Sequence, residues 1–128
     1  MSLRDMLQVM VVDDMSTSRA LITQALDWMG IRNYQTQNDG AAALAQLTRQ
    51  PCHLVISDYN MPAMDGLALL QNLRQHAATR GIGFILVTGR ADKAMVQRGQ
   101  QLGMNNFIQK PFEPPAMRSC IEQVVGRL

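Results

Sequence analysis

Short runs of apolar residues alternate along the chain with longer segments in which apolar residues recur every three or four positions. Four of the runs end in polar residues, and they lie at 9–12, 54–56, 84–87 and 107–108. A weaker fifth stretch at 34–37 leads into Asn38-Asp39-Gly40. Continuous apolar runs with polar ends are typical of strands that are buried on both faces, as in a parallel sheet.

The intervening segments have the spacing of amphipathic helices. We expect the first helix to follow a possible N-cap cluster, Ser16-Thr17-Ser18, and to end before Gly30. The fourth helix is expected from about Asp92 to Leu102, with Gly103 as its stop. The other three are expected around Ala42–Leu47, over Leu67–Leu73 and from Pro114-Pro115 to Val125.

Strand, helix and loop lengths account for nearly the whole chain. A strand of about five residues, a helix of about eleven and two short loops use about 25 residues, so five such units use about 125. The chain has 128 residues. Alternating strands and helices therefore predict an α/β fold with a doubly wound, five-stranded parallel sheet and five helices. In such sheets, ligands bind beyond the carboxyl ends of the strands, so chemistry is expected there.

Composition narrows the classes of function. Hydrophobic residues make up 47% of the chain and charged residues 17%, which argues against disorder. The net charge of +2 and the few aromatic residues do not indicate a nucleic-acid-binding surface. No apolar stretch reaches the roughly 18 residues of a membrane span. Cys52 and Cys120 form neither a CxxC pair nor a disulfide framework. We therefore expect a reduced, soluble, cytoplasmic protein without nucleic-acid or membrane partners.

Three carboxylates stand at the ends of two predicted strands. Asp13 and Asp14 follow the first apolar run, and Asp58 follows the run at 54–56. A single aspartate at such a place usually solvates a loop or caps a helix, whereas three at one sheet edge favour a site. Clustered carboxylates repel each other, and a hard cation with oxygen ligands relieves that repulsion. Mg²⁺ fits best, because no His/Cys cluster suggests zinc.

A hydroxyl and an ammonium group end the last two strands. Thr88 and Lys110 are the kinds of residue that bind phosphoryl oxygens, as a hydrogen-bond donor and a positive charge. The Lys110-Pro111 bond can be cis or trans, and the sequence leaves the isomer open. A carboxylate can attack phosphorus and form an aspartyl phosphate. His53 and His76 are expected to be ordinary surface or packing residues. The pattern therefore indicates a phosphoryl acceptor rather than an enzyme with its own substrate pocket.

Several segments resemble, in their order along the chain, the receiver domain of two-component response regulators. They are Val11–Asp14, Ile56–Pro62, Met64–Gly66, Val87–Gly89 and Lys110–Phe112. Val11–Arg19, Trp28–Gly30 and the Asp58–Pro62 loop are most similar to single-domain chemotaxis regulators of the CheY type. The resemblance covers essentially the whole chain. It implies a flavodoxin-like strand order of 2-1-3-4-5 and one receiver domain, 1–128, with no attached output domain.

The resemblance also implies roles at the strand ends. Asp58 matches the phosphoacceptor, and Asp14 and Asp58 match carboxylate ligands of Mg²⁺, with Asp13 helping through water. Asn60 matches the position whose backbone carbonyl completes the coordination. The protein would catalyse only its own phosphorylation and dephosphorylation.

Further positions match the family's switch. Lys110 and Thr88 match the phosphoryl-binding lysine and the switch hydroxyl, and Phe107 matches the aromatic switch residue. Met95 and Met117 lie on segments that would flank the output face, where soft side chains suit adaptable binding. In the family, phosphorylation pulls the threonine hydroxyl toward the phosphoryl group, the aromatic side chain moves inward, and the output face is altered.

Two departures from the chemotaxis pattern concern output and phosphate lifetime. Phe107 lacks the hydroxyl of the tyrosine common in motor-binding regulators. Arg90 stands where a glutamate is common in that group. Asn60 and Arg90 are the residues expected to modulate dephosphorylation. The implied partners are a chemotaxis histidine kinase, the flagellar motor switch protein or another protein target, and a phosphatase. The sequence names neither the kinase nor the target, and leaves the phosphate lifetime and oligomeric state open.

Three other functions compete with a target-binding switch. A phosphate sink would use the same chemistry without a downstream target. A phosphohydrolase typically has a second aspartate two residues after the nucleophile, where this chain has Asn60, and a cap that 128 residues leave no room for. A flavodoxin-like FMN protein would have to place a phosphate against the acidic segment Asp13–Met15, which repels it unless a metal intervenes.

Overall fold

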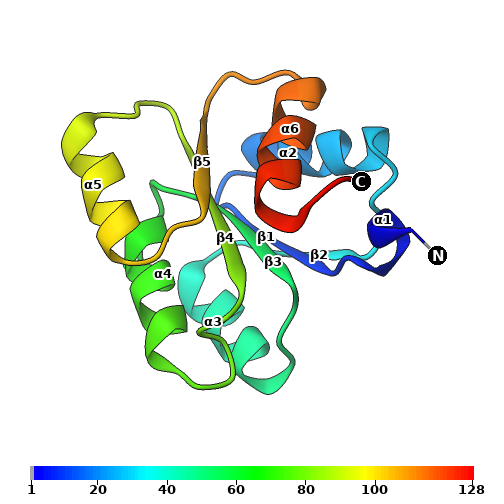
Figure 1. Cartoon of the computed structure of the whole chain (residues 1–128). Coiled ribbons are helices and arrows are strands. Elements are labelled where there is room, and N and C mark those ends of the chain that lie inside the picture. The colour runs from blue at the N-terminus through cyan, green and yellow to red at the C-terminus, as the bar shows by residue number, and fades with distance from the viewer. Residues whose placement is uncertain (1) are drawn as a thin grey trace.

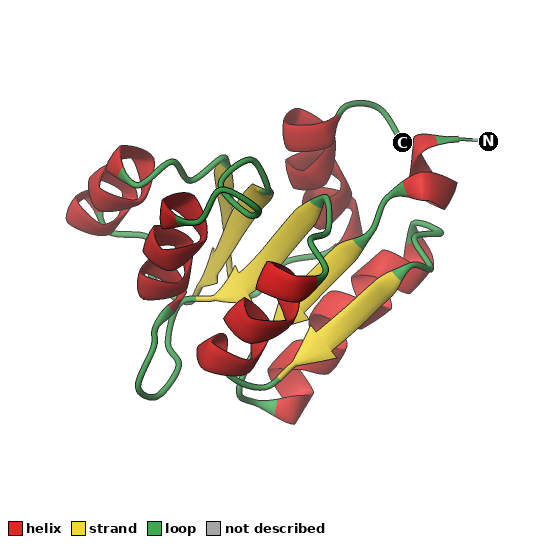
Figure 2. Ribbon diagram, turned by 90° about the horizontal axis from the view of Figure 1, so that it is seen from below, coloured by secondary structure: helices red, strands yellow, loops and turns green. Residues whose placement is uncertain are grey.

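A five-stranded parallel sheet forms the centre of the molecule, with helices packed on both of its faces (Figure 1, Figure 2). The computed structural model describes residues 2–128. The strand order is β2-β1-β3-β4-β5, which confirms the order expected of a flavodoxin-like sheet. The strands are β1 (Val9–Val12), β2 (Tyr34–Gln37), β3 (Leu54–Asp58), β4 (Gly83–Thr88) and β5 (Asn106–Gln109).

Five of the helices are those expected, and a sixth, short one precedes them. The helices are α1 (Leu3–Met6), α2 (Ser16–Trp28), α3 (Gly40–Arg49), α4 (Gly66–Gln75), α5 (Lys93–Gln101) and α6 (Pro114–Val125). The single turn of α1 is capped by Ser2, whose side chain accepts a hydrogen bond from the backbone N–H of Asp5. Four residues are too few to show a helical period, so the pattern of apolar positions could not indicate this helix. Within residues 2–128, no helix has the length and apolar character needed to cross a membrane.

The start of α2 differs from the expectation. Ser16-Thr17-Ser18 form the first turn of the helix rather than its cap, and the N-cap is Met15, which makes no side-chain capping bond. The reason lies in Asp13, whose carboxylate accepts hydrogen bonds from the Met15 N–H and the Ser18 hydroxyl. The serine hydroxyl is therefore directed to a carboxylate and not to a backbone N–H of the first turn.

The remaining helix boundaries follow ordinary capping rules. The side chains of Asp39, Asp65 and Asp92 accept hydrogen bonds from backbone N–H groups in the first turns of α3, α4 and α5. Gly30 and Gly103 adopt positive φ values of 84° and 91° just past the ends of α2 and α5. Both glycines therefore act as the helix stops that the sequence predicted.

The sheet separates two hydrophobic cores. One is shared by α2 and α6 and includes Val11, and the other is shared by α3, α4 and α5 and includes Val12. Successive residues of a strand point to opposite faces, so the continuous apolar run of β1 serves both cores at once. Every residue of β1 and β3 is buried, whereas β2 at the sheet edge is partly or fully exposed. This difference explains why the sequence signal of β2 is weak.

Candidate functional site

Four strands deliver polar side chains to one edge of the sheet. Asp58 is the last residue of β3, Thr88 is the last of β4, and Asp13 and Lys110 directly follow β1 and β5. Carboxylate oxygens of Asp13, Asp14 and Asp58 all lie within 4.8 Å of one another. The expected clustering of the three aspartates is thus what the structure shows. It arises because parallel strands place their carboxyl ends side by side.

Asp13 is completely buried and held on all sides. Its backbone N–H donates to the carbonyl oxygen of Gln37 at 3.1 Å. One carboxylate oxygen accepts from the Met15 N–H at 3.0 Å, and the other accepts from the Ser18 hydroxyl. The Arg19 guanidinium donates to the Asp13 carbonyl at 2.8 Å. These contacts fasten the amino end of α2 to Asp13 and fix the direction of its carboxylate.

Asp14 and Asn60 form the exposed side of the site. The chain bends at Asp14, and this bend allows two consecutive aspartates to contribute to one cluster. Asn60 lies two residues beyond Asp58 in the loop between β3 and α4, and its side chain is exposed. Both groups are therefore open to solvent beside the buried Asp13 and Asp58.

Asp58 is 5% exposed, and its Oδ1 lies 2.8 Å from Nζ of Lys110. Burial raises the pKa of this carboxyl group above its usual value. The hydrogen bond from Lys110 acts in the opposite direction, and the charges of Asp13 and Asp14 add to the rise. Burial is the largest cause of the rise, and the repulsion from the two neighbouring carboxylates is the part of it that a cation at the cluster would relieve.

Lys110 reaches the acidic cluster from the far edge of the sheet. The Lys110-Pro111 peptide bond is cis, which resolves the isomer that the sequence left open. The backbone N–H of Lys110 donates to the carbonyl oxygen of Thr88 at 2.7 Å. Its Nζ donates to Oγ of Ser18 at 3.0 Å, in addition to its contact with Asp58. Sequence reasoning missed Ser18 because nothing in a single sequence pairs it with a lysine 92 positions away.

Thr88 is 2% exposed, and its hydroxyl group is turned toward the loop that follows β4. The hydroxyl donates to the backbone carbonyl of Arg90 at 3.0 Å and accepts from the backbone N–H of Arg90 at 3.2 Å. The Arg90 side chain is exposed. A Cβ atom added to Gly89 would meet no atom within 4 Å, so the approach beside Thr88 is open.

The loop after Asp58 is tied to the sheet by backbone contacts. The N–H of Tyr59 donates to the carbonyl of Val87, and the N–H of Gly66 donates to the carbonyl of Tyr59, both at 2.9 Å. A Cβ atom on Gly66 would lie 2.5 Å from the carbonyl oxygen of Asp58 and 2.6 Å from Cδ1 of Leu86. Glycine is therefore required here for close packing of α4 against the end of β3. The sequence indicated Gly66 only as the residue before a predicted helix and as part of the segment Met64–Gly66 that resembles the family.

The residues expected at the output face occupy different environments. Phe107 is half-buried on β5 and packs against the core shared by α3, α4 and α5. Met95 is 6% exposed and belongs to that same core, whereas Met117 is completely buried in the core of α2 and α6. The expectation that these two methionines offer exposed side chains for binding is therefore wrong. Their helical positions turn them toward the sheet, where they fill the cores.

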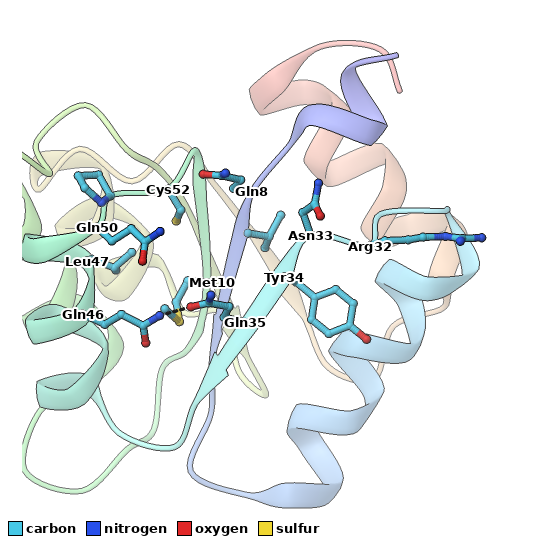
Figure 3. A pocket seen from close by; sticks show the side chains of 12 residues that line it. Gln8, Met10, Arg32, Asn33, Tyr34, Gln35, Gln46, Leu47, Gln50 and Cys52 are labelled. Atoms are coloured by element: carbon cyan, nitrogen blue, oxygen red, sulfur yellow. Dashed lines mark hydrogen bonds between the residues drawn. The ribbon is translucent and has the colours of Figure 1, made fainter. Parts of the chain in front are cut away.

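A cavity of about 360 Å³ lies apart from these residues, beside the amino-terminal halves of β1 and β2 (Figure 3). It is lined by residues from the two strands, from α3 and from the loops at their ends. Its lining consists of Gln8, Val9, Met10, Arg32, Asn33, Tyr34, Gln35, Gln46, Leu47, Gln50, Pro51 and Cys52. The side chains of Gln46 and Gln35 hydrogen-bond to each other there (Figure 3). The lining includes none of the three clustered aspartates.

Comparison with known proteins identifies the family. The model of the response regulator receiver domain matches residues 9–122. The chain is 44% identical over 128 residues to a probable chemotaxis protein CheY of Rhizobium etli, covering 100% of this chain and 99% of that protein. It is 30% identical over 122 residues to chemotaxis protein CheY-3 of Vibrio cholerae, covering 95% of this chain and 94% of that protein.

Solved structures agree with this match. Chemotaxis protein CheY4 of Vibrio cholerae superimposes with a TM-score of 0.86 at 26% identity, covering 93% of this chain and 98% of that one. The receiver domain of a sensor histidine kinase of Pseudomonas aeruginosa, solved with a magnesium ion in its active site cleft, has a TM-score of 0.84. The two chains are 23% identical, with 94% of this chain and 98% of that one covered. At this identity the structural similarity supports the fold alone.

The chain belongs to the response regulator receiver domain family. Its full-length similarity to chemotaxis proteins supports a response regulator in chemotaxis. Receiver domains of this type are signalling proteins rather than classical enzymes, and they interact with histidine kinases and other protein targets.

Proposed function

We propose that this protein is a cytoplasmic chemotaxis switch that accepts a phosphoryl group from a histidine kinase onto Asp58. The observation that carries the proposal is the contact of 2.8 Å between Lys110 Nζ and Asp58 Oδ1 beside two further carboxylates. A nearly buried carboxylate, a cation in contact with it and a hydroxyl on the neighbouring strand are the groups that phosphoryl transfer to an aspartate needs.

The transfer step uses few groups. A carboxylate oxygen of Asp58 attacks the phosphorus of a phosphohistidine, and the P–N bond to the imidazole breaks as the new P–O bond forms. The imidazole leaves as the neutral ring after taking a proton from solvent. The ammonium of Lys110 and the hydroxyl of Thr88 then bind oxygens of the phosphoryl group. No general base is required, because the ionised carboxylate is itself the nucleophile.

The donor set at the acidic cluster fits Mg²⁺. Three carboxylates within 4.8 Å of one another offer hard oxygen ligands, and a cation would relieve the repulsion among them. Asp14, Asp58 and the backbone carbonyl of Asn60 would hold the ion, with Asp13 acting through water. When bound, the ion would neutralise charge on the phosphoryl oxygens.

The output would follow from movement of Thr88 and Phe107. Thr88 would exchange its hydrogen bonds with the Arg90 backbone for one to the phosphoryl group. Phe107, on the adjacent strand β5, would repack and alter the surface formed by α5, β5 and α6. A few kcal/mol of new contacts are enough to bias two pre-existing states of such a surface. The target would be the flagellar motor switch protein or another protein.

A phosphate sink for the same kinase is the second candidate. Phe107 supports it, because a phenylalanine has no hydroxyl with which to form a hydrogen bond at the output surface. Asn60 and Arg90 are both exposed beside the site, and we expect them to set the rate of dephosphorylation by water or by a phosphatase. A pull-down with phosphorylated and unphosphorylated protein separates the candidates, since only a target-binding switch captures a motor protein when phosphorylated.

Labelling tests the phosphoacceptor directly. The chain is incubated with Mg²⁺ and radiolabelled phospho-kinase, and separately with labelled acetyl phosphate. We expect Asp58→Asn to take up no label, and EDTA to block uptake by the unmodified protein. Asp27→Asn is the matched control, because Asp27 is an exposed aspartate on α2 outside the acidic cluster. Uptake by Asp58→Asn at the unmodified rate would refute the assignment, and equal labelling with EDTA would remove the metal from the mechanism.

A further inference from the structure

Ser18 occupies the space between two parts of the site that lie far apart in sequence. Its hydroxyl oxygen accepts a hydrogen bond from Nζ of Lys110 at 3.0 Å, and its hydroxyl proton is donated to the carboxylate of Asp13. Ser18 is therefore the one side chain among residues 2–128 that hydrogen-bonds to both Lys110 and Asp13. The hydroxyl can serve both partners because it has one proton to donate and free lone pairs to accept.

The placement of Ser18 is built into the start of α2. The helix begins at Ser16, and its amino end is fastened to Asp13 through the N–H of Met15 and the guanidinium of Arg19. Those contacts set the position of the first turn relative to the acidic cluster. Ser18 lies in that turn, so its hydroxyl is placed to donate to Asp13.

Ser18 also restricts Lys110. An ammonium group at the end of a flexible stem has three N–H donors and can point in many directions. In this structure one donor is directed to Asp58 and one to Ser18. Thr88 does not compete as a partner, because its hydroxyl is engaged with the backbone of Arg90. Two fixed contacts locate Nζ at the side of Asp58, where a phosphoryl group would arrive.

We infer that Ser18 is a positioning residue for phosphoryl transfer, which holds the Lys110 ammonium beside Asp58 and orients the Asp13 carboxylate toward the cation. This inference rests on the proposed function. Groups that orient metal ligands or catalytic side chains, without touching the metal or the substrate themselves, typically contribute tenfold or more to metal affinity or rate. Loss of the hydroxyl therefore weakens Mg²⁺ binding about tenfold and slows phosphoryl uptake at saturating Mg²⁺ about tenfold.

The test uses the full chain, with Ser18→Ala and the matched control Ser16→Ala. Ser16 lies in the same helical turn and is exposed, and its side chain makes no hydrogen bond within residues 2–128. Isothermal titration with MgCl₂ gives the dissociation constant without any phosphodonor. Labelled acetyl phosphate at saturating Mg²⁺ gives the rate of uptake, in which the acyl phosphate forms on Asp58 as the P–O bond to the acetyl group breaks and acetate leaves.

We expect Ser18→Ala to change both quantities, Ser16→Ala to change neither, and Ser18→Thr, which keeps a hydroxyl, to retain most of both. Ser18→Cys serves as a second variant of similar volume with a much weaker donor, and should behave like Ser18→Ala. Equal values for Ser18→Ala and Ser16→Ala in either measurement overturn the inference. If the unmodified protein takes up no label, the proposed function fails together with the Lys110 part of the inference. The titration then decides the Asp13 part alone.

Discussion

Nζ of Lys110 lies 2.8 Å from Oδ1 of Asp58, although Asp58 ends β3, Lys110 follows β5, and β4 lies between these two strands. Lys110→Met removes the positive charge from this pair and leaves the length of the side chain nearly unchanged. Loss of one preorganised charged donor typically costs about a hundredfold in rate, so we expect phosphoryl uptake to slow by that factor. Lys110→Arg is the charge-conserving control. Initial rates with labelled acetyl phosphate measure the effect, and an unchanged rate for Lys110→Met would assign the lysine to structure alone.

Asp58→Asn is expected to stabilise the protein in the absence of Mg²⁺. Burial and the neighbouring aspartates raise the pKa of Asp58, so the folded state holds its proton more tightly than the unfolded state does. Its ionised form therefore costs stability, and this cost grows as the pH rises from the unfolded pKa through the raised folded pKa. A gain of about 1 kcal/mol would raise the Tm by roughly 4 °C in a domain of this size.

The pH dependence of that difference provides the check. The gain from Asp58→Asn should vanish near pH 3, where both states of the unmodified protein are protonated, and be largest at neutral pH. Urea unfolding of both proteins across this range measures it. A gain that grows as the pH falls would contradict the sign of the pKa shift.

Thr88→Val removes a hydroxyl whose two hydrogen bonds both go to the backbone of Arg90. We expect the free protein to lose about 1 kcal/mol of stability, because neutral hydrogen bonds contribute about that much. Labelling of Asp58 should continue, whereas partner binding should no longer depend on phosphorylation. Thr88→Ser keeps the hydroxyl and should keep the dependence. A pull-down with phosphorylated and unphosphorylated forms of each variant tests this, and Thr88→Val that discriminates normally would exclude Thr88 from the switch.

Phe107→Ala should uncouple phosphorylation from partner binding while leaving label uptake intact. Phe107 is half-buried, so we expect a loss of about 2 kcal/mol, below the 3–5 kcal/mol typical of fully buried phenylalanines. Ile108→Ala is the control, because the adjacent side chain packs in the opposite core. If both variants respond to phosphorylation equally in the pull-down, Phe107 only fills the core.

Gly66→Ala and Gly89→Ala should differ sharply in stability. A Cβ atom at Gly66 would lie 2.5 Å from the carbonyl of Asp58, whereas one at Gly89 would meet nothing within 4 Å. Overpacking of this kind typically costs 1–3 kcal/mol, about what we expect for Gly66→Ala. Gly89→Ala should stay within about 0.5 kcal/mol of the unmodified protein. Urea unfolding of the pair measures both, and equal stabilities would mean that the loop after Asp58 yields freely.

The sequence predicted the sheet because its inner strands β1, β3 and β4 are buried on both faces and therefore appear as uninterrupted apolar runs. The clustering of Asp13, Asp14 and Asp58 followed from the geometry of parallel strands, which brings their carboxyl ends together. What the pattern could not show depends on contacts between distant segments. The contact of Ser18 with Lys110 and the close approach of Gly66 to Leu86 are of this kind.

Side-chain direction was the other source of error. Met95 and Met117 were placed on the correct helices, but residue spacing did not establish that both face the sheet. Ser16, Thr17 and Ser18 have the composition of a cap, yet they form the first turn of α2, and the Ser18 hydroxyl donates to the carboxylate of Asp13 instead. In the first case packing in the cores decided the side-chain direction, and in the second a carboxylate five positions earlier in the chain did.

The 2.7 Å hydrogen bond between the Lys110 N–H and the Thr88 carbonyl directly joins, through the backbone, the two residues that we propose to bind the phosphoryl group. Between Thr88 and Lys110 the chain runs through α5 and β5. Changing the length or sequence of α5 and its loops need not alter the spacing between the Thr88 hydroxyl and the Lys110 ammonium group. The proposed output surface can therefore be redesigned while the backbone contact between Thr88 and Lys110 is kept.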